Sequence, residues 1–173
     1  MSNAAAIESI RLIVPEGEQQ MDAVRAIFRD YADSLSVDLG FQGFEAELVN
    51  LPGSYAAPSG GLLLALVGGD VAGCGAFRRL TDVDYPNACE MKRLFVRPGF
   101  RRLGLGRLLA RELIDRATQA GYSTMLLDTL DEMEAARELY VTLGFVEVPP
   151  YYYSPVAGAH HLCVDLGQVN TGY

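Results

Sequence analysis

The 173-residue chain has no tryptophan, only three cysteines, and no long run of apolar residues. Three cysteines are too few, and odd in number, for a disulfide framework, and no two of them have the spacing of a metal-binding finger. We therefore expect free thiols, a cytoplasmic location and no bound metal. No apolar segment approaches the roughly 20 residues that cross a bilayer, and the N-terminus lacks the basic and apolar regions of a secretion signal. Neither a membrane span nor export is expected.

Acidic residues outnumber basic ones and give a formal net charge of −8, which argues against a dedicated nucleic-acid-binding protein. The charge is unevenly spread. The window 92–116 holds eight of the fourteen lysine and arginine residues against two acidic ones, so it carries +6 and the rest of the chain −14. Its basic residues are Lys92, Arg93, Arg97, Arg101, Arg102, Arg107, Arg111 and Arg116. The window predicts a local anion site within an acidic protein.

Half of the residues are apolar, and a chain of this length suits one compact domain. We expect a single domain over residues 1–173, with residues 1–5 disordered or derived from an expression tag. Apolar periodicity and turn signals predict strands at 6–14, twice within 61–77, and at 89–96, 123–130, 145–148 and 160–166, and helices at 16–35, 44–51, 105–120 and 131–144. This βααβββαβαββ order indicates an α/β fold of the α+β kind, with one mixed sheet flanked by about four helices.

The most informative stretch is RPGFRRLGLGRLLA, residues 97–110, which joins a predicted strand to a predicted helix. A glycine-containing turn at such a place directs the free N–H groups and the dipole of the helix onto one anion. The dinucleotide-binding fingerprint would need a third glycine where Leu109 stands, and no P-loop string occurs in the chain. What remains is the pattern R/Q-x-x-G-x-G/A, met by residues 101–106, or a plain helix N-cap.

This pattern resembles the pyrophosphate-binding loop of the GNAT superfamily of acetyl-CoA-dependent N-acetyltransferases. The segments CEMKRLFVRPGFRRLGLGRLL, LLDTLDEMEAARELYVTLGF and PPYYYSPVAGAHHLCVDL are similar to the central and C-terminal parts of that superfamily, in the expected order. The similarity covers residues 61–166, more than half of the chain. The resemblance implies a mostly antiparallel central sheet, acetyl-CoA as cosubstrate, and a homodimer as the default assembly.

The resemblance also implies where acetyl-CoA is held. The pyrophosphate would meet the glycine-rich turn. The pantetheine arm would pair like an extra strand with the end of the preceding strand, whose N–H groups near Phe95 and Val96 would also stabilise the oxyanion. The cofactor-binding residues implied in this way are Leu94, Phe95, Val96, Arg101, Arg102, Leu103, Gly104, Leu105, Gly106 and Arg107.

Two catalytic residues follow from the same resemblance. Glu90 precedes Arg101 by eleven residues, the spacing at which some family members carry a general-base glutamate. Its alternative role is a structural ion pair with Lys92 or a nearby arginine. Tyr140 matches the tyrosine that many members place beside the cofactor sulfur as general acid. Its alternative role is that of a core aromatic residue with a hydrogen-bonded hydroxyl.

Some features depart from the family pattern. Many members have an asparagine early in the last helix, where this chain has Asp131-Glu132-Met133-Glu134, so that cofactor contact does not carry over and Glu134 would disfavour phosphates. His160 and His161 face opposite sides of a strand and cannot share a metal ion. Three tyrosines in the loop 149–159 are costly to expose, so we expect this loop to line the acceptor pocket or a dimer contact.

The resulting hypothesis is an N-acetyltransferase that passes acetyl from acetyl-CoA directly to a primary amine of a small molecule or peptide, without a covalent enzyme intermediate. The alternative is a non-catalytic acyl-CoA-binding module of the same fold. Only the enzyme predicts thiol release that depends on an acceptor. A nucleotide-binding protein of the Rossmann type is disfavoured by the missing third glycine. No nucleic-acid or membrane partner is expected, and the sequence leaves the identity of the amine open.

Overall fold

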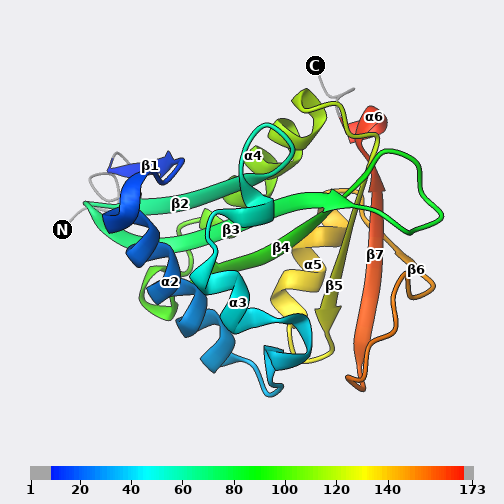
Figure 1. Ribbon diagram of the computed structural model, residues 1–173, viewed down its shortest axis with the longest axis horizontal. Helices are drawn as coiled ribbons and strands as arrows, with labels where there is room; N and C mark the ends of the chain where they lie inside the picture. The colour runs from blue at the N-terminus through cyan, green and yellow to red at the C-terminus, as the bar shows by residue number, and fades with distance from the viewer. Residues whose placement is uncertain (1–8, 170–173) are drawn as a thin grey trace.

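The computed structural model describes residues 9–169, so the expectation for residues 1–5 lies outside the described part of the chain. The strands form one seven-stranded sheet in the order β1-β2-β3-β4-β5-β7-β6 (Figure 1). All neighbouring strands pair antiparallel except β4 and β5, which pair parallel. The strands are β1 (Ile10–Ile13), β2 (Gly61–Val67), β3 (Asp70–Leu80), β4 (Ala88–Val96), β5 (Thr124–Leu130), β6 (Val146–Val148) and β7 (Ala159–Asp165).

Four main helices flank the sheet. Helices α2 (Gly17–Ser34) and α3 (Phe44–Val49) lie on one face, and α4 (Leu105–Gln119) and α5 (Glu134–Thr142) lie on the other (Figure 1). The predicted βααβββαβαββ order and the mixed, mostly antiparallel sheet are therefore confirmed. The described chain adds α6 (Leu166–Val169) and the 3-10 turns η1 (Leu39–Gln42), η2 (Gly53–Tyr55) and η3 (Pro98–Phe100).

The start of α5 was predicted three residues too early. Asp131 donates its backbone N–H to the carbonyl of Gly158 at 2.9 Å, which extends the contact between β5 and the chain before β7. The Met133 N–H closes a turn by donating to the carbonyl of Leu130 at 2.9 Å, and the carbonyl of Met133, the N-cap of α5, accepts from the Arg137 N–H at 3.0 Å. The helix therefore begins at Glu134, and residues 131–133 form a turn at the open end of β5.

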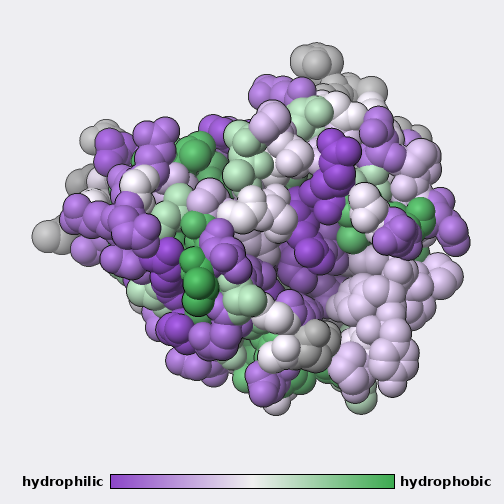
Figure 2. Space-filling view, viewed as in Figure 1, coloured by the Kyte–Doolittle hydropathy of each residue, from purple (hydrophilic) through white to green (hydrophobic). Residues whose placement is uncertain are grey.

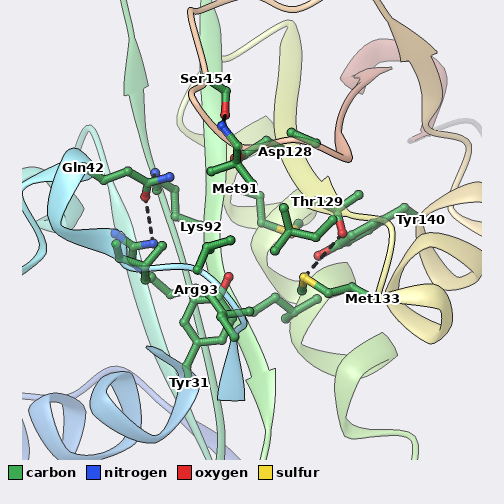
Figure 3. Close-up of a pocket in the computed structure, with 17 residues that line it drawn as sticks. Tyr31, Gln42, Met91, Lys92, Arg93, Asp128, Thr129, Met133, Tyr140 and Ser154 are labelled. Carbon is green, nitrogen blue, oxygen red and sulfur yellow. Dashed lines mark hydrogen bonds between the residues drawn. The ribbon is translucent and has the colours of Figure 1, made fainter. Parts of the chain in front are cut away.

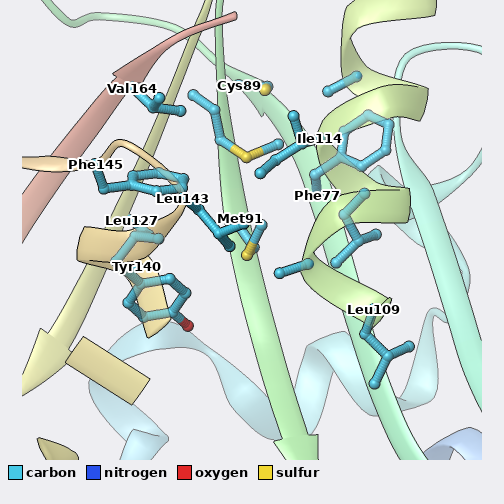
Figure 4. Close-up of a cluster of buried hydrophobic side chains, with 14 of the residues drawn as sticks. Phe77, Cys89, Met91, Leu109, Ile114, Leu127, Tyr140, Leu143, Phe145 and Val164 are labelled. Carbon is cyan, nitrogen blue, oxygen red and sulfur yellow. The ribbon is translucent and has the colours of Figure 1, made fainter. Parts of the chain in front are cut away.

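Helix α4 packs through the leucine face that its periodicity predicts. Leu105, Leu109, Leu113 and Ala117 are each at most 1% exposed. In Figure 4, Leu109 and Ile114 of this helix lie on one side of Met91, while Tyr140, Leu143 and Phe145 lie on the other. Side chains of α4 and of the α5 region therefore pack around Met91 on the same face of β4, and this packing positions the turn in front of α4 relative to the sheet.

Strands β4 and β5 separate after a short stretch of pairing. Their parallel register covers only Ala88–Glu90 with Thr124–Leu126. Beyond this stretch β4 stays paired with β3 as far as Val96, and β5 stays paired with β7 as far as Leu130. The two halves of the sheet therefore diverge, and the ends of β4 and β5 leave an opening between them (Figure 1).

A β-bulge at Arg93 changes which face the residues of β4 occupy. Arg93 has a φ of 62°, and the register moves from Ala76 opposite Lys92 to Cys74 opposite Phe95. An extra residue in one strand shifts the alternation of side chains that follow. Hence Met91 and Leu94 both pack in the apolar cluster of α4, although they are three residues apart.

The side chain of Arg93 lies on the α3 side, where it is 2% exposed. Its guanidinium donates to both carboxylate oxygens of Glu47 at 3.0 and 2.9 Å and to Gln42 Oε1 at 3.0 Å. It also lies 5.3 Å from the centre of the Phe44 ring. The bulge therefore places a positive charge under α3, where a forked ion pair compensates it.

We predict that Arg93→Met lowers the free energy of unfolding by about 3 kcal/mol, because the partly buried Glu47 loses its cation. Urea denaturation measures this loss. Arg29→Met is the matched control. Arg29 of α2 pairs at 3.0 Å with Glu45, which lies on α3 as Glu47 does, but both side chains of this pair are more than half exposed. The control should have no measurable effect. Equal losses in the two variants would show that the buried pair has no special role.

Candidate active site

The opening between β4 and β5 forms a pocket, which we call the central pocket. It is lined from one side by residues 91–94 of β4 and from the other by residues 128–130 of β5, with Tyr31 and Tyr140 at its walls (Figure 3). The ring of Tyr140 comes from α5, and its hydroxyl end points toward the pocket (Figure 3). The pocket thus follows directly from the divergence of the two strands.

A second cavity, of about 530 Å³, adjoins the central pocket and shares Tyr31, Leu35, Leu94 and Met133 with it; we call it the outer cleft. It is lined by the end of β4, by the glycine-rich turn and by the start of α5. Of the ten residues predicted to bind the cofactor, those that line this cleft are Leu94, Phe95, Val96, Arg101 and Gly106. Residues that are up to twelve positions apart in the sequence therefore meet at one cavity.

The glycine-rich turn leaves the N-terminus of α4 open. Gly104 caps the helix with a φ of 76° and no side-chain hydrogen bond, and a Cβ added there would meet no atom within 4 Å. A Cβ on Gly106 would lie 3.5 Å from Leu139 of α5, so the turn and α5 approach closely. Leu105 is buried in the core, so only its backbone is available to a ligand, and Leu103 packs against the same core while partly exposed.

The arginines of the turn are not neutralised by carboxylates. In the described residues no ion pair involves Arg101, Arg102 or Arg107, whereas other basic residues of the window pair with acids, as Arg97 does with Asp30 at 2.8 Å. Arg101 Nε donates to the carbonyl of Val96 at 3.3 Å, and Arg107 donates to Thr142 Oγ1 at 2.9 Å. Positive charge is therefore available where the helix N-terminus already favours an anion.

Glu90 is 2% exposed and hydrogen-bonded at both oxygens. Arg78, which lies opposite it on β3, donates to Oε1 from Nε at 3.0 Å, and its Nη2 lies 2.8 Å from the same oxygen as an ion pair. The hydroxyl of Tyr151 donates to Oε2 at 2.6 Å. Lys92 Nζ is 4.0 Å from Oε1. The ion pair considered from the sequence thus exists, chiefly with Arg78, and Tyr151 joins the loop 149–159 to the same carboxylate.

Tyr140 is 5% exposed, and burial raises the pKa of its hydroxyl above the ordinary value. Its ring packs against Phe145 at a centroid distance of 5.6 Å. Among the described residues its hydroxyl has no hydrogen-bond partner. It is therefore a protonated phenol held at the wall of the central pocket with its donor unused.

The tyrosine loop packs onto the sheet through His161. Tyr151 and Tyr152 meet the imidazole edge to face at centroid distances of 4.9 and 5.1 Å. Tyr152 also donates to Asp128 Oδ2 at 2.5 Å. Burial, followed by the nearby carboxylates, raises the pKa of both phenols. The loop is thereby anchored to β4, β5 and β7.

A third cavity, of about 360 Å³, opens beside this loop, and we call it the tyrosine pocket. It is lined by Tyr151–Tyr153, by the end of β3, by Glu90 and Lys92 of β4, and by Glu47 of α3. It shares Gln42 and Lys92 with the central pocket. Figure 2 shows the α2 and α3 face of the molecule, where strongly hydrophilic side chains gather near the centre.

The sequence of residues 22–145 matches the profile of the acetyltransferase (GNAT) family, and this match covers the turn, Glu90 and Tyr140. The chain belongs to the GNAT acetyltransferase family.

Other members resemble this GNAT protein along most of its length. An uncharacterised N-acetyltransferase of Schizosaccharomyces pombe is 36% identical over 87% of this chain and 91% of its own. An acetyltransferase structure from Streptococcus agalactiae has a TM-score of 0.74 at 18% identity and covers 91% of this chain and 99% of its own. A putative acetyltransferase from Salmonella typhimurium, whose structure contains acetyl-CoA, has a TM-score of 0.65 at 20% identity, with 91% and 94% covered.

His160 and two of the cysteines of this GNAT acetyltransferase lie outside the three pockets. His160 faces away from His161, as expected from its strand, and bonds to Glu147 at 2.5 Å and to Asp131. Cys74 and Cys89 are buried, which raises the pKa of both thiols, that of Cys89 to about 12. Within residues 9–169, none of the helices has both the length and the apolar character to span a membrane.

Sequence reasoning missed Arg78 and Asp128 as parts of the site. It considered Lys92 only as a basic residue of the window and as an alternative ion-pair partner of Glu90, and Arg93 only as a charge. Arg78 reaches Glu90 because of the β3–β4 register, which runs unshifted from Leu80 opposite Ala88 to Ala76 opposite Lys92 and is therefore set by the loop between the strands. One signal was present in the sequence. The adjacent charges Lys92 and Arg93 break the alternation of β4, which is typical of a bulge.

Proposed function

We propose that this protein is a cytoplasmic N-acetyltransferase that moves the acetyl group of acetyl-CoA directly to a primary amine of a small molecule or peptide. The observation that carries the proposal is the arrangement of the three cavities. The outer cleft adjoins the central pocket at Leu94, and the tyrosine pocket adjoins it at Lys92. A donor and an acceptor that enter from these two cavities would meet between β4 and β5.

The outer cleft suits a donor with a pyrophosphate and an extended amide-bearing arm. The N-terminus of α4 and the unpaired charges of Arg101 and Arg102 would hold the phosphates, while Leu94–Val96 lie beyond the stretch where β4 pairs with β5. Acetyl-CoA supplies an acetyl thioester to this site. Glu132 and Glu134 also line the cleft, and Glu134 would disfavour phosphates placed next to it. Glu132 Oε1 already accepts from Ser36, from Oγ at 2.8 Å and from the backbone N–H at 3.2 Å.

Proton transfer is the chemistry left to the side chains. Glu90 would take the proton of the attacking amine, through Tyr151 or a water molecule, because its own oxygens are already hydrogen-bonded. Tyr140 would donate its unused phenolic proton to the sulfur as the C–N bond forms and the C–S bond breaks. The amine nitrogen ends as a neutral amide, and no covalent bond to the enzyme is needed.

The test of the function is acceptor-dependent thiol release. We would screen the wild-type protein against a panel of primary amines. We expect it to release free CoA from acetyl-CoA only in the presence of an amine that it acetylates. Glu90→Gln should lower kcat by about a hundredfold while its acetyl-CoA Kd stays unchanged, since the amide cannot accept a proton. Binding of acetyl-CoA without release by any amine would favour the non-catalytic module. An unaltered kcat in Glu90→Gln would leave Glu90 as an ion-pair partner of Arg78.

We predict that Gly104→Glu abolishes acetyl-CoA binding, because it places bulk and a negative charge before the N-terminus of α4. Isothermal titration calorimetry measures the Kd. Gly68→Glu is the matched control: Gly68 also has a positive φ, of 59°, and open space around an added Cβ, but it lies in the β2–β3 turn. The two variants share the backbone strain. An unchanged acetyl-CoA Kd in Gly104→Glu would show that the phosphates of acetyl-CoA do not bind at this turn.

We predict that Tyr140→Phe lowers kcat about a hundredfold and leaves the acetyl-CoA Kd unchanged, because only the proton donor is lost. A thiol-release assay gives kcat, and isothermal titration calorimetry gives the acetyl-CoA Kd. Tyr31→Phe is the comparison, because it removes the other phenol at the wall of the central pocket. A loss of kcat in Tyr31→Phe alone would transfer the role of general acid to Tyr31, and no loss in either variant would place both phenols in a structural role.

A further inference from the structure

Lys92 is the single lysine of the chain; the remaining thirteen of the fourteen lysine and arginine residues are arginines. It lies on β4 two residues after Glu90 and is 9% exposed. It lines both the central pocket and the tyrosine pocket. Its ammonium group therefore stands where the two cavities meet.

The hydrogen bonding of this ammonium group is incomplete. Nζ donates to Gln42 Oε1 at 3.0 Å, and the same amide oxygen also accepts from Arg93 Nη1 at 3.0 Å. Its nearest ion-pair contact, Glu90 Oε1, is 4.0 Å away. An ammonium has three donors, and a buried charge without a close partner is costly. Burial lowers the pKa of Lys92, with Glu90 opposing this effect.

The carboxylates near Lys92 are each committed to another donor. Glu90 accepts from Arg78 and Tyr151, and Asp128 accepts from Tyr152. Glu47 receives the fork of Arg93 at 3.0 and 2.9 Å. Asp82 lies at the exposed rim of the tyrosine pocket. Around this cavity, Lys92 is thus the buried cation that lacks an anion at hydrogen-bond distance in the described chain.

We infer that the acceptor carries a carboxylate as well as its primary amine, and that Lys92 binds this carboxylate where the tyrosine pocket meets the central pocket. The inference rests on the proposed function and narrows its substrate to molecules of the amino-acid type. Because Lys92 is two residues from Glu90 on the same face of β4, a carboxylate held by Lys92 leaves the neighbouring amine beside Glu90 and the opening between the strands. The cavity of about 360 Å³ leaves room for a side chain against Tyr151–Tyr153.

A single lysine makes the binding visible without turnover. Protein labelled with 13C at the lysine ε carbon gives one lysine resonance, and we would titrate it, with CoA present, with the proteinogenic α-amino acids and with their C-terminal amides. We expect at least one acid to shift the resonance and raise the pKa of Lys92, because an anion favours the charged amine. Its amide should do neither. If no acid shifts the resonance, or if each amide does so equally, the inference is wrong.

Kinetics give the second readout. We expect kcat/KM to favour the acid over its amide by about tenfold or more, in line with a charged hydrogen bond. Lys92→Met should remove this preference and Lys92→Arg should retain part of it. Arg79→Met is the control, since Arg79 lies on β3, is exposed and lines none of the three cavities. It should leave the preference unchanged. A preference that survives in Lys92→Met overturns the inference.

The two proposals fail in different ways. Acetylation of amines and amides without preference for the acid would keep the N-acetyltransferase and overturn the role of Lys92. An acid that shifts the Lys92 resonance but is never acetylated would keep the carboxylate site and overturn the proposed function. The wild-type titration does not depend on the folding of any variant, and the circular dichroism and acetyl-CoA Kd of Lys92→Met show whether its kinetics report on the lysine alone.

Discussion

The bulge at Arg93 is the constraint on which the rest of this structure depends. A regular strand through residues 88–96 would turn either Lys92 or Arg93 toward the apolar cluster under α4. The extra residue lets both charges stay on the α3 side while Met91, Leu94 and Val96 pack on the other face. One strand then presents charged side chains to the cavities on one face and buried apolar side chains to the core on the other. The positive φ that this requires is held by the forked ion pair of Arg93 with Glu47.

The opening between the diverging strands β4 and β5 is partly covered by a neighbouring loop. A parallel pair that ends after three residues exposes backbone groups that would otherwise be paired. Here the loop 149–159 covers one side of the opening, and its tyrosines donate to Glu90 of β4 and Asp128 of β5. The two separated strands are therefore bridged by Tyr151 and Tyr152, whose ring centroids are 5.2 Å apart. These side-chain contacts connect the two strands where the backbone hydrogen bonds between them have ended.

The sequence was sufficient for the parts that depend on local pattern. The order of the elements follows from periodicity, and the turn follows from its glycines and arginines. Of the three tyrosines that are costly to expose, Tyr151 and Tyr152 pack on His161, whereas Tyr153 is 89% exposed. The parts it missed depend on register. Arg78 meets Glu90 because of the register that the loop between β3 and β4 sets, before the bulge is reached, and no residue near Arg78 indicates that alignment. The turn at residues 131–133 that precedes α5 likewise includes a hydrogen bond to Gly158, which is distant in sequence.

The choice of lysine at position 92 in a chain otherwise built with arginine has a physical reason in the same strand. Arg93 faces a partner, Glu47, whose two oxygens match a rigid planar fork. Lys92 faces a cavity, and a compact ammonium with rotatable donors can follow a ligand that arrives and leaves, whereas a fork needs a fixed bidentate partner. A guanidinium at position 92 would have the fixed carboxylate of Glu90 within reach and would compete with Arg78 for it. Lysine therefore keeps Glu90 with its present donors and leaves a cation free to meet an anion from outside.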